Sequence, residues 1–324
     1  MNFKILNLLG KHFDGEAQKI LNKLGRVEYK VMTRKELLLI VDKYDIIVVG
    51  VAPHIDKVVL QKAKNLKCVA IPANTLENID VEYAESKGVK VISLWGERKF
   101  LDTITGTAEL AAGLMIDVTR LTPWAFDSIR NYEWSREKFR GHNLYGQTLG
   151  IVGMGRLGTW MARYGKAFGM EVLFYDPHVG KSRVGGCHKV SFVELLKRSD
   201  IVSIHAHLNA STENMFNKSA FSKMKKSAYL INTARGRVVD EGALLKALQK
   251  KEIAGYAGDV LADELKFDDE GFINHPMIRH AKKHTNVIVV PHIGGMTHES
   301  RSRTDIFTME KLAAVFGKMK PRKI

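Results

Sequence analysis

The chain has 324 residues, of which 45% are hydrophobic and 26% are charged. This composition is typical of globular proteins and excludes disordered and collagen-like classes, and at ~150 residues per domain the length predicts about two domains. Lys and Arg total 50 against 35 acidic residues, a net charge of +15 that is compatible with an anionic partner. The basic residues are spread along the chain without a zinc-finger or RNA-binding signature. We therefore expect a solvated basic surface and no nucleic-acid site.

Cysteine content and apolar runs bear on the compartment. Cys68 and Cys187 are the two cysteines, which excludes a disulfide scaffold and fits a reducing environment. No apolar run approaches the ~20 residues that span a bilayer. Residues 1–7 lack the basic-then-apolar layout of a secretion signal. We expect a cytoplasmic protein with no membrane association.

The first hundred residues alternate short apolar runs with helical segments. The runs at residues 3–9, 45–49, 68–71 and 89–92 predict strands. Residues 15–24 predict an amphipathic helix that stops at Gly25, and Asp80 is a candidate cap for a helix reaching Lys87. Repeated strand–helix–strand order predicts a parallel sheet with helices on both faces.

A long apolar-striped helix is expected over residues 105–129, with a kink at Pro123, and residues 131–145 are expected to form a surface loop. A second alternation then predicts six strands, which matches a dinucleotide-binding sheet. Ser191 with Glu194 predicts a capping box, and Asp240 predicts another helix cap. The expected strands are residues 149–152, 172–175, 201–204, 229–231, 255–259 and 287–290.

The last predicted helix, residues 297–316, lies beyond the sixth strand and must pack elsewhere. The simplest layout is an α/β protein of two parallel-sheet domains, the second inserted into the first. We expect one domain from residues 1–102 and 296–324, and the other from residues 103–295.

A glycine-rich loop follows the strand at residues 149–152. Gly153 permits a tight turn, Gly155 lets backbone approach a pyrophosphate, and Gly158 lets the following helix pack against the sheet. Asp176 ends the next strand, where a carboxylate can accept hydrogen bonds from ribose hydroxyls. This arrangement favours NAD over NADP, although Lys181 and Arg183 are close enough in sequence to reach a 2′-phosphate.

Three further segments follow predicted strands, at residues 232–237, 258–264 and 291–295. Ligands of open parallel sheets lie beyond the carboxyl ends of the strands, so Arg235, Glu264 and His292 are candidate site residues. Taken singly, each is more often an ordinary surface or packing residue. Their joint occurrence in this order favours a site.

Together with Asn-Ile-Asp at residues 78–80 and the glycine loop, these segments resemble the NAD-dependent D-isomer 2-hydroxyacid dehydrogenase family over about residues 65–309. The resemblance implies a flavodoxin-like substrate-binding lid and an inserted Rossmann domain that binds NAD. It implies reversible hydride transfer between NAD(H) and a D-2-hydroxy acid/2-keto acid pair, without a metal. Arg235 would bind the substrate carboxylate, His292 would be the acid–base, and Glu264 would orient His292 and raise its pKa.

The resemblance also implies the remaining site residues, a small anionic substrate and a homodimer. Ala73 and Asn74 would join Arg235 and His292 at the substrate. The cofactor-binding residues would be Gly153, Gly155, Arg156, Leu157, Gly158, Asp176, Ala206, Thr233, Ala234, Asp259, Gly294 and Gly295.

Two departures from the family pattern leave alternatives open. The glycines usual before Asn-Ile-Asp are missing from residues 71–77, which weakens the expectation of 3-phosphoglycerate as substrate. Residues 94–101 form a longer connection than usual and could shape either the substrate pocket or a dimer surface. A non-catalytic NAD-sensing module is the alternative to an enzyme.

Overall fold

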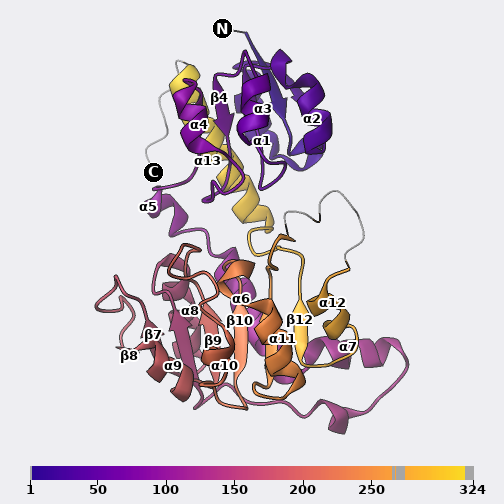
Figure 1. Cartoon of the computed structure of the whole chain (residues 1–324), viewed down its shortest axis with the longest axis vertical. Coiled ribbons are helices and arrows are strands. Elements are labelled where there is room, and N and C mark those ends of the chain that lie inside the picture. Colours follow the sequence, from indigo (N-terminus) through magenta and orange to yellow (C-terminus); the bar gives the residue numbers. More distant parts are fainter. Residues whose placement is uncertain (1, 265–266, 268–273, 318–324) are drawn as a thin grey trace. The chain divides into compact units, whose positions relative to one another are not determined.

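The computed structural model describes residues 2–264, 267 and 274–317, and the chain divides into two compact units (Figure 1). The first unit comprises Met1–Ile104 and Thr297–Ile324, and the second comprises Thr105–Met296. Residues 318–324 of the expected first domain lie outside the described residues. The chain thus crosses between the units after Ile104 and after Met296.

The first unit contains a parallel sheet in the order β2-β1-β3-β4-β5. The strand order reverses between β1 and β3, as in flavodoxin-like folds. The strands are β1 (Phe3–Asn7), β2 (Gly25–Tyr29), β3 (Ile46–Val48), β4 (Cys68–Ala70) and β5 (Lys90–Ile92). The helices are η1 (Gly10–His12), α1 (Gly15–Asn22), α2 (Arg34–Ile40), η2 (Val41–Lys43), α3 (Lys57–Lys62), α4 (Val81–Ser86), α5 (Arg98–Leu101) and α13 (His298–Phe316).

Helix α13 comes from the far end of the chain and packs against α1 and the first unit's sheet (Figure 1). Thr297 caps this helix by accepting a hydrogen bond from the N–H of Ser300, and the helix predicted over residues 297–316 is observed over His298–Phe316. Met309 and Leu312 of α13 are buried in the same apolar cluster as Ile5 of β1. Burial of this apolar stripe is what fixes the terminal helix here.

One expectation for the first unit was wrong. The helix predicted over residues 15–24 ends at Asn22 with Lys23 as its C-cap, and Gly25 begins β2, a strand that the sequence analysis did not predict. A Cβ at Gly25 would lie 2.0 Å from the backbone oxygen of Phe3, so the glycine permits close approach of β2 to β1. Strand β2 was missed because its side chains are only half-buried at the sheet edge and lack an apolar run.

The second unit contains a seven-stranded parallel sheet in the order β12-β11-β10-β9-β6-β7-β8. Its order reverses between β6 and β9, which is where ligands bind in open α/β sheets. The strands are β6 (Thr148–Val152), β7 (Glu171–Tyr175), β8 (Cys187–Lys189), β9 (Ile201–Ile204), β10 (Tyr229–Asn232), β11 (Gly255–Gly258) and β12 (Val287–Val289). The helices are α6 (Gly106–Arg120), α7 (Thr122–Arg130), η3 (Arg136–Phe139), α8 (Arg156–Ala167), α9 (Phe192–Arg198), α10 (Lys218–Phe221), η4 (Gly236–Val238), α11 (Glu241–Gln249) and α12 (Pro276–Ala281).

Helices cover both faces of this sheet, and successive strand side chains point to opposite faces. Leu230 of β10 packs in the cluster formed with α9, α10, α11 and α12. Its neighbour Ile231 packs in the other cluster, with α6 and α8. Because the strands are buried on both sides, their carboxyl ends are the part of the sheet open to a ligand.

The second unit corrects three expectations. Its sheet has a seventh strand, β8, whose polar sequence at the edge gave no apolar signal. The helix expected over residues 105–129 is two helices, because Leu121 adopts a left-handed φ of 59° and Pro123 lies in the first turn of α7, where its missing N–H is tolerated. Ser191 caps α9 as predicted, but Glu194 pairs with Arg198 instead of completing a capping box.

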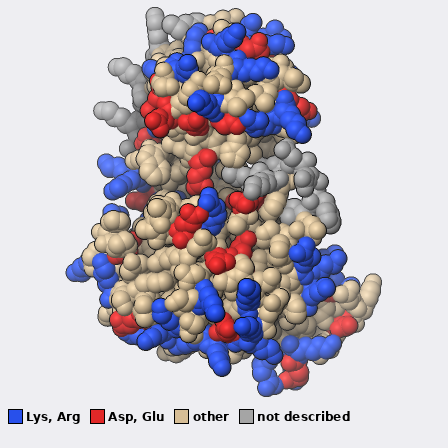
Figure 2. All heavy atoms as spheres, in the orientation of Figure 1, with Lys and Arg blue, Asp and Glu red and all other residues tan. Residues whose placement is uncertain are grey.

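No helix within the described ranges is both long and apolar enough to cross a bilayer. Figure 2 shows Lys and Arg side chains spread over the visible face of both units with acidic side chains among them.

Candidate functional site

The glycine loop connects the carboxyl end of β6 to α8. Gly153 has a φ of 92°, and a Cβ there would lie 2.8 Å from the backbone nitrogen of Ala206, which follows β9. A Cβ on Gly158 would lie 2.0 Å from the oxygen of Gly153. A Cβ on Gly155 would meet no described atom within 4 Å. Gly153 and Gly158 are therefore required by packing, whereas Gly155 leaves an open approach to backbone.

The amino end of α8 fits a bound pyrophosphate. Gly155 is its N-cap, and no side chain of the described residues caps the helix. The first N–H groups of a helix need acceptors, and its positive dipole end favours an anion. Arg156 and Leu157 begin this helix beside Gly155, which places them at the same end.

Asp176 has a second role that the sequence did not reveal. Its Oδ2 accepts a hydrogen bond from the N–H of Met154 at 2.8 Å, and its Oδ1 accepts from His178 and Val179 at 2.8 and 3.1 Å. A carboxylate offers about four acceptor positions, so capacity for a ribose hydroxyl remains on Oδ2. Asp176 thus ties the end of β7 to the glycine loop.

Two buried polar atoms at the carboxyl edge of the sheet lack hydrogen-bond partners among the described residues: Oγ1 of Thr233 and Nδ1 of His205. Burial lowers the pKa of His205 to about 4, so this imidazole is neutral. Because buried polar groups are normally paired, Thr233, which follows β10, fits contact with a bound group. Together with the open glycine loop, this makes the edge suitable for NAD.

Arg235 lies in the loop after β10, and Asn232 shapes that loop. The side chain of Asn232 accepts from the N–H of Ala234 at 3.0 Å and donates to the oxygen of Arg235 at 3.0 Å. The guanidinium of Arg235 donates to the oxygen of Ala234 at 2.7 Å. Asn232 is fully buried, and its position at the end of a buried strand was the available sequence signal for this role.

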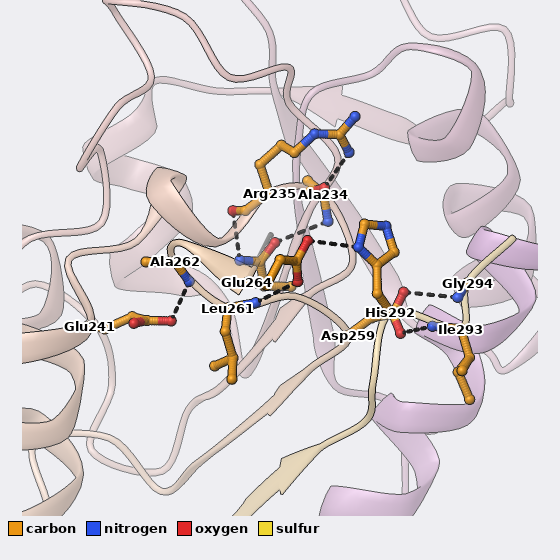
Figure 3. A network of polar contacts seen from close by, with 11 residues as sticks. Ala234, Arg235, Glu241, Asp259, Leu261, Ala262, Glu264, His292, Ile293 and Gly294 are labelled. Carbon is orange, nitrogen blue, oxygen red and sulfur yellow. Dashed lines mark hydrogen bonds and ion pairs between the residues drawn. The ribbon is translucent and has the colours of Figure 1, made fainter. Parts of the chain in front are cut away.

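Glu264 and His292 point toward one another (Figure 3). Nδ1 of His292 lies 2.6 Å from Oε1 of Glu264, and the other oxygen of Glu264 accepts from the N–H of Leu261 at 3.1 Å. The hydrogen bond that His292 donates to Glu264 raises the pKa of His292, while burial and the charge of Arg235 oppose this rise. His292 is thereby biased toward the protonated form, with Nε2 as its second nitrogen.

Asp259 anchors the loop that carries His292. Its two carboxylate oxygens accept from the N–H groups of Ile293 at 2.6 Å and Gly294 at 2.9 Å (Figure 3). Its backbone oxygen accepts from the N–H of His292. Burial raises the pKa of Asp259. His292 adopts a left-handed φ of 51°, and this bracing offsets the cost of that conformation.

The Arg235 and Glu264 loops are in backbone contact. A Cβ on Gly236 would lie 2.1 Å from the carbonyl carbon of Leu261 and 2.3 Å from the nitrogen of Ala262. Only glycine allows such an approach. The position of Arg235 is therefore mechanically tied to the turn that carries Glu264.

The second unit brings nearly all predicted site residues to one sheet edge. Thr233, Ala234 and Arg235 follow β10, and Asp259 and Glu264 follow β11. The segment after β12 supplies His292, Gly294 and Gly295. Ala73 and Asn74 belong to the first unit, in the loop after β4. Among the described residues, no group of three or more His, Cys, Asp or Glu side chains is arranged to hold a metal ion.

The chain is similar to known proteins in both sequence and structure. Residues 112–294 match the family described as D-isomer specific 2-hydroxyacid dehydrogenase, NAD binding domain. The chain is 32% identical to hydroxypyruvate reductase of Thermotoga maritima, over 94% of this chain and 96% of that protein. The structure superposes on D-lactate dehydrogenase of Aquifex aeolicus, complexed with NAD and lactic acid, with a TM-score of 0.84 and 29% identity over 97% of this chain and 96% of that chain.

Some relatives are longer than this chain. It is 34% identical to D-3-phosphoglycerate dehydrogenase of Methanocaldococcus jannaschii over 93% of its own length, but covers 55% of that protein. The chain thus spans about half the length of the first curated relatives it matches.

Proposed function

Because the chain belongs to the D-isomer specific 2-hydroxyacid dehydrogenase family, we propose that it catalyses the reversible, NAD-linked interconversion of a D-2-hydroxy acid and its 2-keto acid. The observation that carries this proposal is the Glu264–His292 hydrogen bond, on the same sheet edge as Arg235 and the glycine loop. NAD bound there supplies the hydride acceptor, or the hydride donor when reduced. The remaining roles fall to side chains of this protein.

His292 is the proposed acid–base. Its Nδ1 faces Glu264, so Nε2 is the atom that holds the proton for the substrate oxygen. The raised pKa favours the protonated ring, which reduction of a keto acid needs as its acid. In the oxidative direction the same Nε2 takes the hydroxyl proton. Glu264 stabilises the imidazolium and fixes the ring orientation.

Arg235 is the proposed carboxylate-binding residue. A guanidinium can donate two parallel hydrogen bonds to a carboxylate, which orients the 2-keto acid as well as binding it. Its positive charge, together with protonated His292, also stabilises negative charge developing on the carbonyl oxygen. Neither role requires a metal ion. In the cofactor site, we assign the pyrophosphate to residues 153–158 and the ribose to Asp176.

The first unit is proposed to be the substrate-binding domain. Ala73 and Asn74 lie beyond the carboxyl end of β4, where a parallel sheet presents backbone groups to a ligand. The N–H of Leu94 donates to the oxygen of Ala73 at 3.1 Å, which ties this loop to the segment after β5. On this proposal, Asn74→Ala raises the KM for the keto acid and leaves NADH affinity unchanged.

We also infer a homodimer formed through the second unit. Phe126 and Ile129 on α7 and the following Tyr132 and Trp134 are exposed, Tyr132 at 99% and Trp134 at 88%. Aromatic side chains gathered on one surface are typical of protein interfaces. Sedimentation of the protein at micromolar concentration is expected to give twice the chain mass, and a monomer would contradict the inference.

The activity is tested by NADH oxidation at 340 nm against pyruvate, hydroxypyruvate, glyoxylate, phosphohydroxypyruvate, 2-ketoglutarate and branched 2-keto acids. Turnover of at least one, abolished in His292→Ala with NADH binding retained, is the expected result. Wild-type turnover in His292→Ala, or tight NADH binding with no turnover of any acid, would argue against the proposed activity.

A further inference from the structure

A second carboxylate–imidazole pair, Glu241 and His275, lies next to the turn that carries Glu264. Glu241 is the first residue of α11, and His275 immediately precedes α12. Oε2 of Glu241 lies 3.2 Å from Nε2 of His275. Oε1 of Glu241 accepts a hydrogen bond from the N–H of Ala262 at 2.8 Å (Figure 3). No role assigned above uses this pair.

The helix that follows His275 fixes the tautomer of its ring. Nδ1 of His275 accepts a hydrogen bond from the N–H of Met277 in the first turn of α12, at 3.3 Å. Burial, followed by the charge of Arg279, lowers the pKa of His275 and so favours the neutral ring. With Nδ1 acting as an acceptor, the proton of that neutral ring lies on Nε2, which faces Glu241. Oε2 of Glu241 thus lies 3.2 Å from the protonated nitrogen of His275, and this contact orients the carboxylate.

The turn at residues 261–264 needs support from outside itself. Asp263 adopts a left-handed φ of 59°, a conformation that costs free energy in a residue with a side chain. Within the turn, the N–H of Leu261 is used by Glu264, and Gly236 contacts the backbone from the side of the Arg235 loop. Glu241 holds the N–H of the intervening residue, Ala262.

We propose that Glu241, oriented by His275, is a positioning residue that holds Ala262 and thereby aligns Glu264 on His292. The inference rests on the proposed function, because it assigns these two side chains a part in the same site. Neither side chain touches the substrate or cofactor positions assigned above, so both act through Glu264. The chain of contacts is continuous from α12 through α11 to the imidazole of His292.

The ionisation of Glu241 supports this role. Burial raises its pKa to about 7, and the nearby charges of Asp263 and Glu264 add to the rise. Glu241 is not needed as the cap of α11, because Asp240 already caps this helix by accepting from the N–H of Ala243. The two contacts that Glu241 makes outside α11 offset part of the cost of burying its carboxyl group.

The first test measures His292 directly, by NMR titration of its imidazole in the full-length protein without substrate. Two variants break the pair at different points: Glu241→Ala removes both contacts, and His275→Asn keeps a good cap for α12 while removing the contact with Glu241. Glu194→Ala is the matched control, since Glu194 is an acid in the first turn of α9 that pairs with Arg198 away from the site. The His292 pKa is expected to fall toward ~6.5 in both variants and to stay unchanged in the control.

The second test uses kinetics of keto acid reduction. Both variants are expected to lower kcat/KM by about tenfold or more, because small displacements of a catalytic group are costly. The alkaline limb of the pH profile should move to lower pH, and NADH affinity should stay at the wild-type value. In the Glu264→Gln background, Glu241→Ala should add little further loss, because its effect passes through Glu264.

The results that would contradict the positioning role differ from those that would contradict the proposed function. An unchanged His292 titration in both variants, or losses that multiply fully in the double variant, would overturn the positioning role. A purely structural role would lower thermal stability without moving the pH limb. If wild-type protein turns over no keto acid, the proposed function fails, but the His292 titration still decides whether Glu241 aligns Glu264. If Glu241→Ala does not fold, His275→Asn decides alone.

Discussion

The imidazole of His292 and the carboxylate of Glu264 are joined across a 2.6 Å hydrogen bond, although 28 positions separate them in the chain. Each is held in turn by backbone contacts, Glu264 by the N–H of Leu261 and His292 by the oxygen of Asp259. The hydrogen bond raises the pKa of His292, which is the property an acid–base at neutral pH needs.

Replacing Glu264 with Gln should therefore change the pH dependence of keto acid reduction. Reduction needs protonated His292, so kcat/KM falls as pH rises through its raised pKa. Gln removes the negative charge that raises this pKa, and the limb should move to lower pH. At pH 7.5 we expect a loss of about 10²-fold in kcat/KM. A limb at the wild-type position in the Gln variant, measured over pH 5.5–9, would contradict the role of Glu264; Glu194→Gln serves as the control.

Arg235→Lys should separate substrate binding from cofactor binding. Lys keeps the positive charge but loses the two-pronged geometry, so the KM for the keto acid is expected to rise about 30-fold, corresponding to ~2 kcal/mol for a charge-assisted contact. NADH affinity should not change. Arg237→Lys is the matched control, because Arg237 is an exposed neighbour that pairs with Glu213. Equal effects of the two substitutions would show that Arg235 is an ordinary surface cation.

Two glycine substitutions in the loop at residues 153–158 should differ in their effect on the Tm while both weaken NADH binding. Gly158→Ala puts a Cβ 2.0 Å from the oxygen of Gly153, so it should lower the Tm as well as weaken NADH binding. Gly155→Ala meets no described atom within 4 Å, so it should keep the Tm and still weaken NADH binding about tenfold or more, by obstructing the pyrophosphate. Calorimetry and NADH fluorescence titration measure both. Normal NADH affinity in Gly155→Ala would place the pyrophosphate elsewhere.

Asp259→Ala should destabilise the second unit. The substitution leaves the N–H groups of Ile293 and Gly294 without their carboxylate acceptor, at a cost of about 2 kcal/mol in the free energy of unfolding. The substitution also removes the contacts that hold the left-handed backbone at His292. Turnover by the folded variant should therefore fall as well, beyond the loss caused by unfolded protein. Denaturant unfolding measures the first effect, with the exposed Asp42→Ala as control. A variant with wild-type unfolding would contradict the anchoring role.

Some helix caps and strands could be predicted from short sequence patterns, because the interactions that form them are between residues close in sequence. Asp80 and Asp240 cap their helices as predicted, since a cap needs only a side chain within three residues of its N–H partner. The buried strands were predicted from apolar runs. Strands β2 and β8 were missed because they lie at sheet edges, where pairing with a neighbour rather than burial of a run defines the strand.

The sequence by itself determined the order of strand-end motifs, and this order indicated Arg235, Glu264 and His292 as site residues and the family resemblance. Only the tertiary structure decided how these side chains are held. Asp259 bracing His292, Gly236 pressed on Leu261, and Glu241 bonded to Ala262 are contacts between loops of different strands. Such contacts depend on the three-dimensional packing of segments that are distant in sequence, so the spacing of residues along the chain does not predict them.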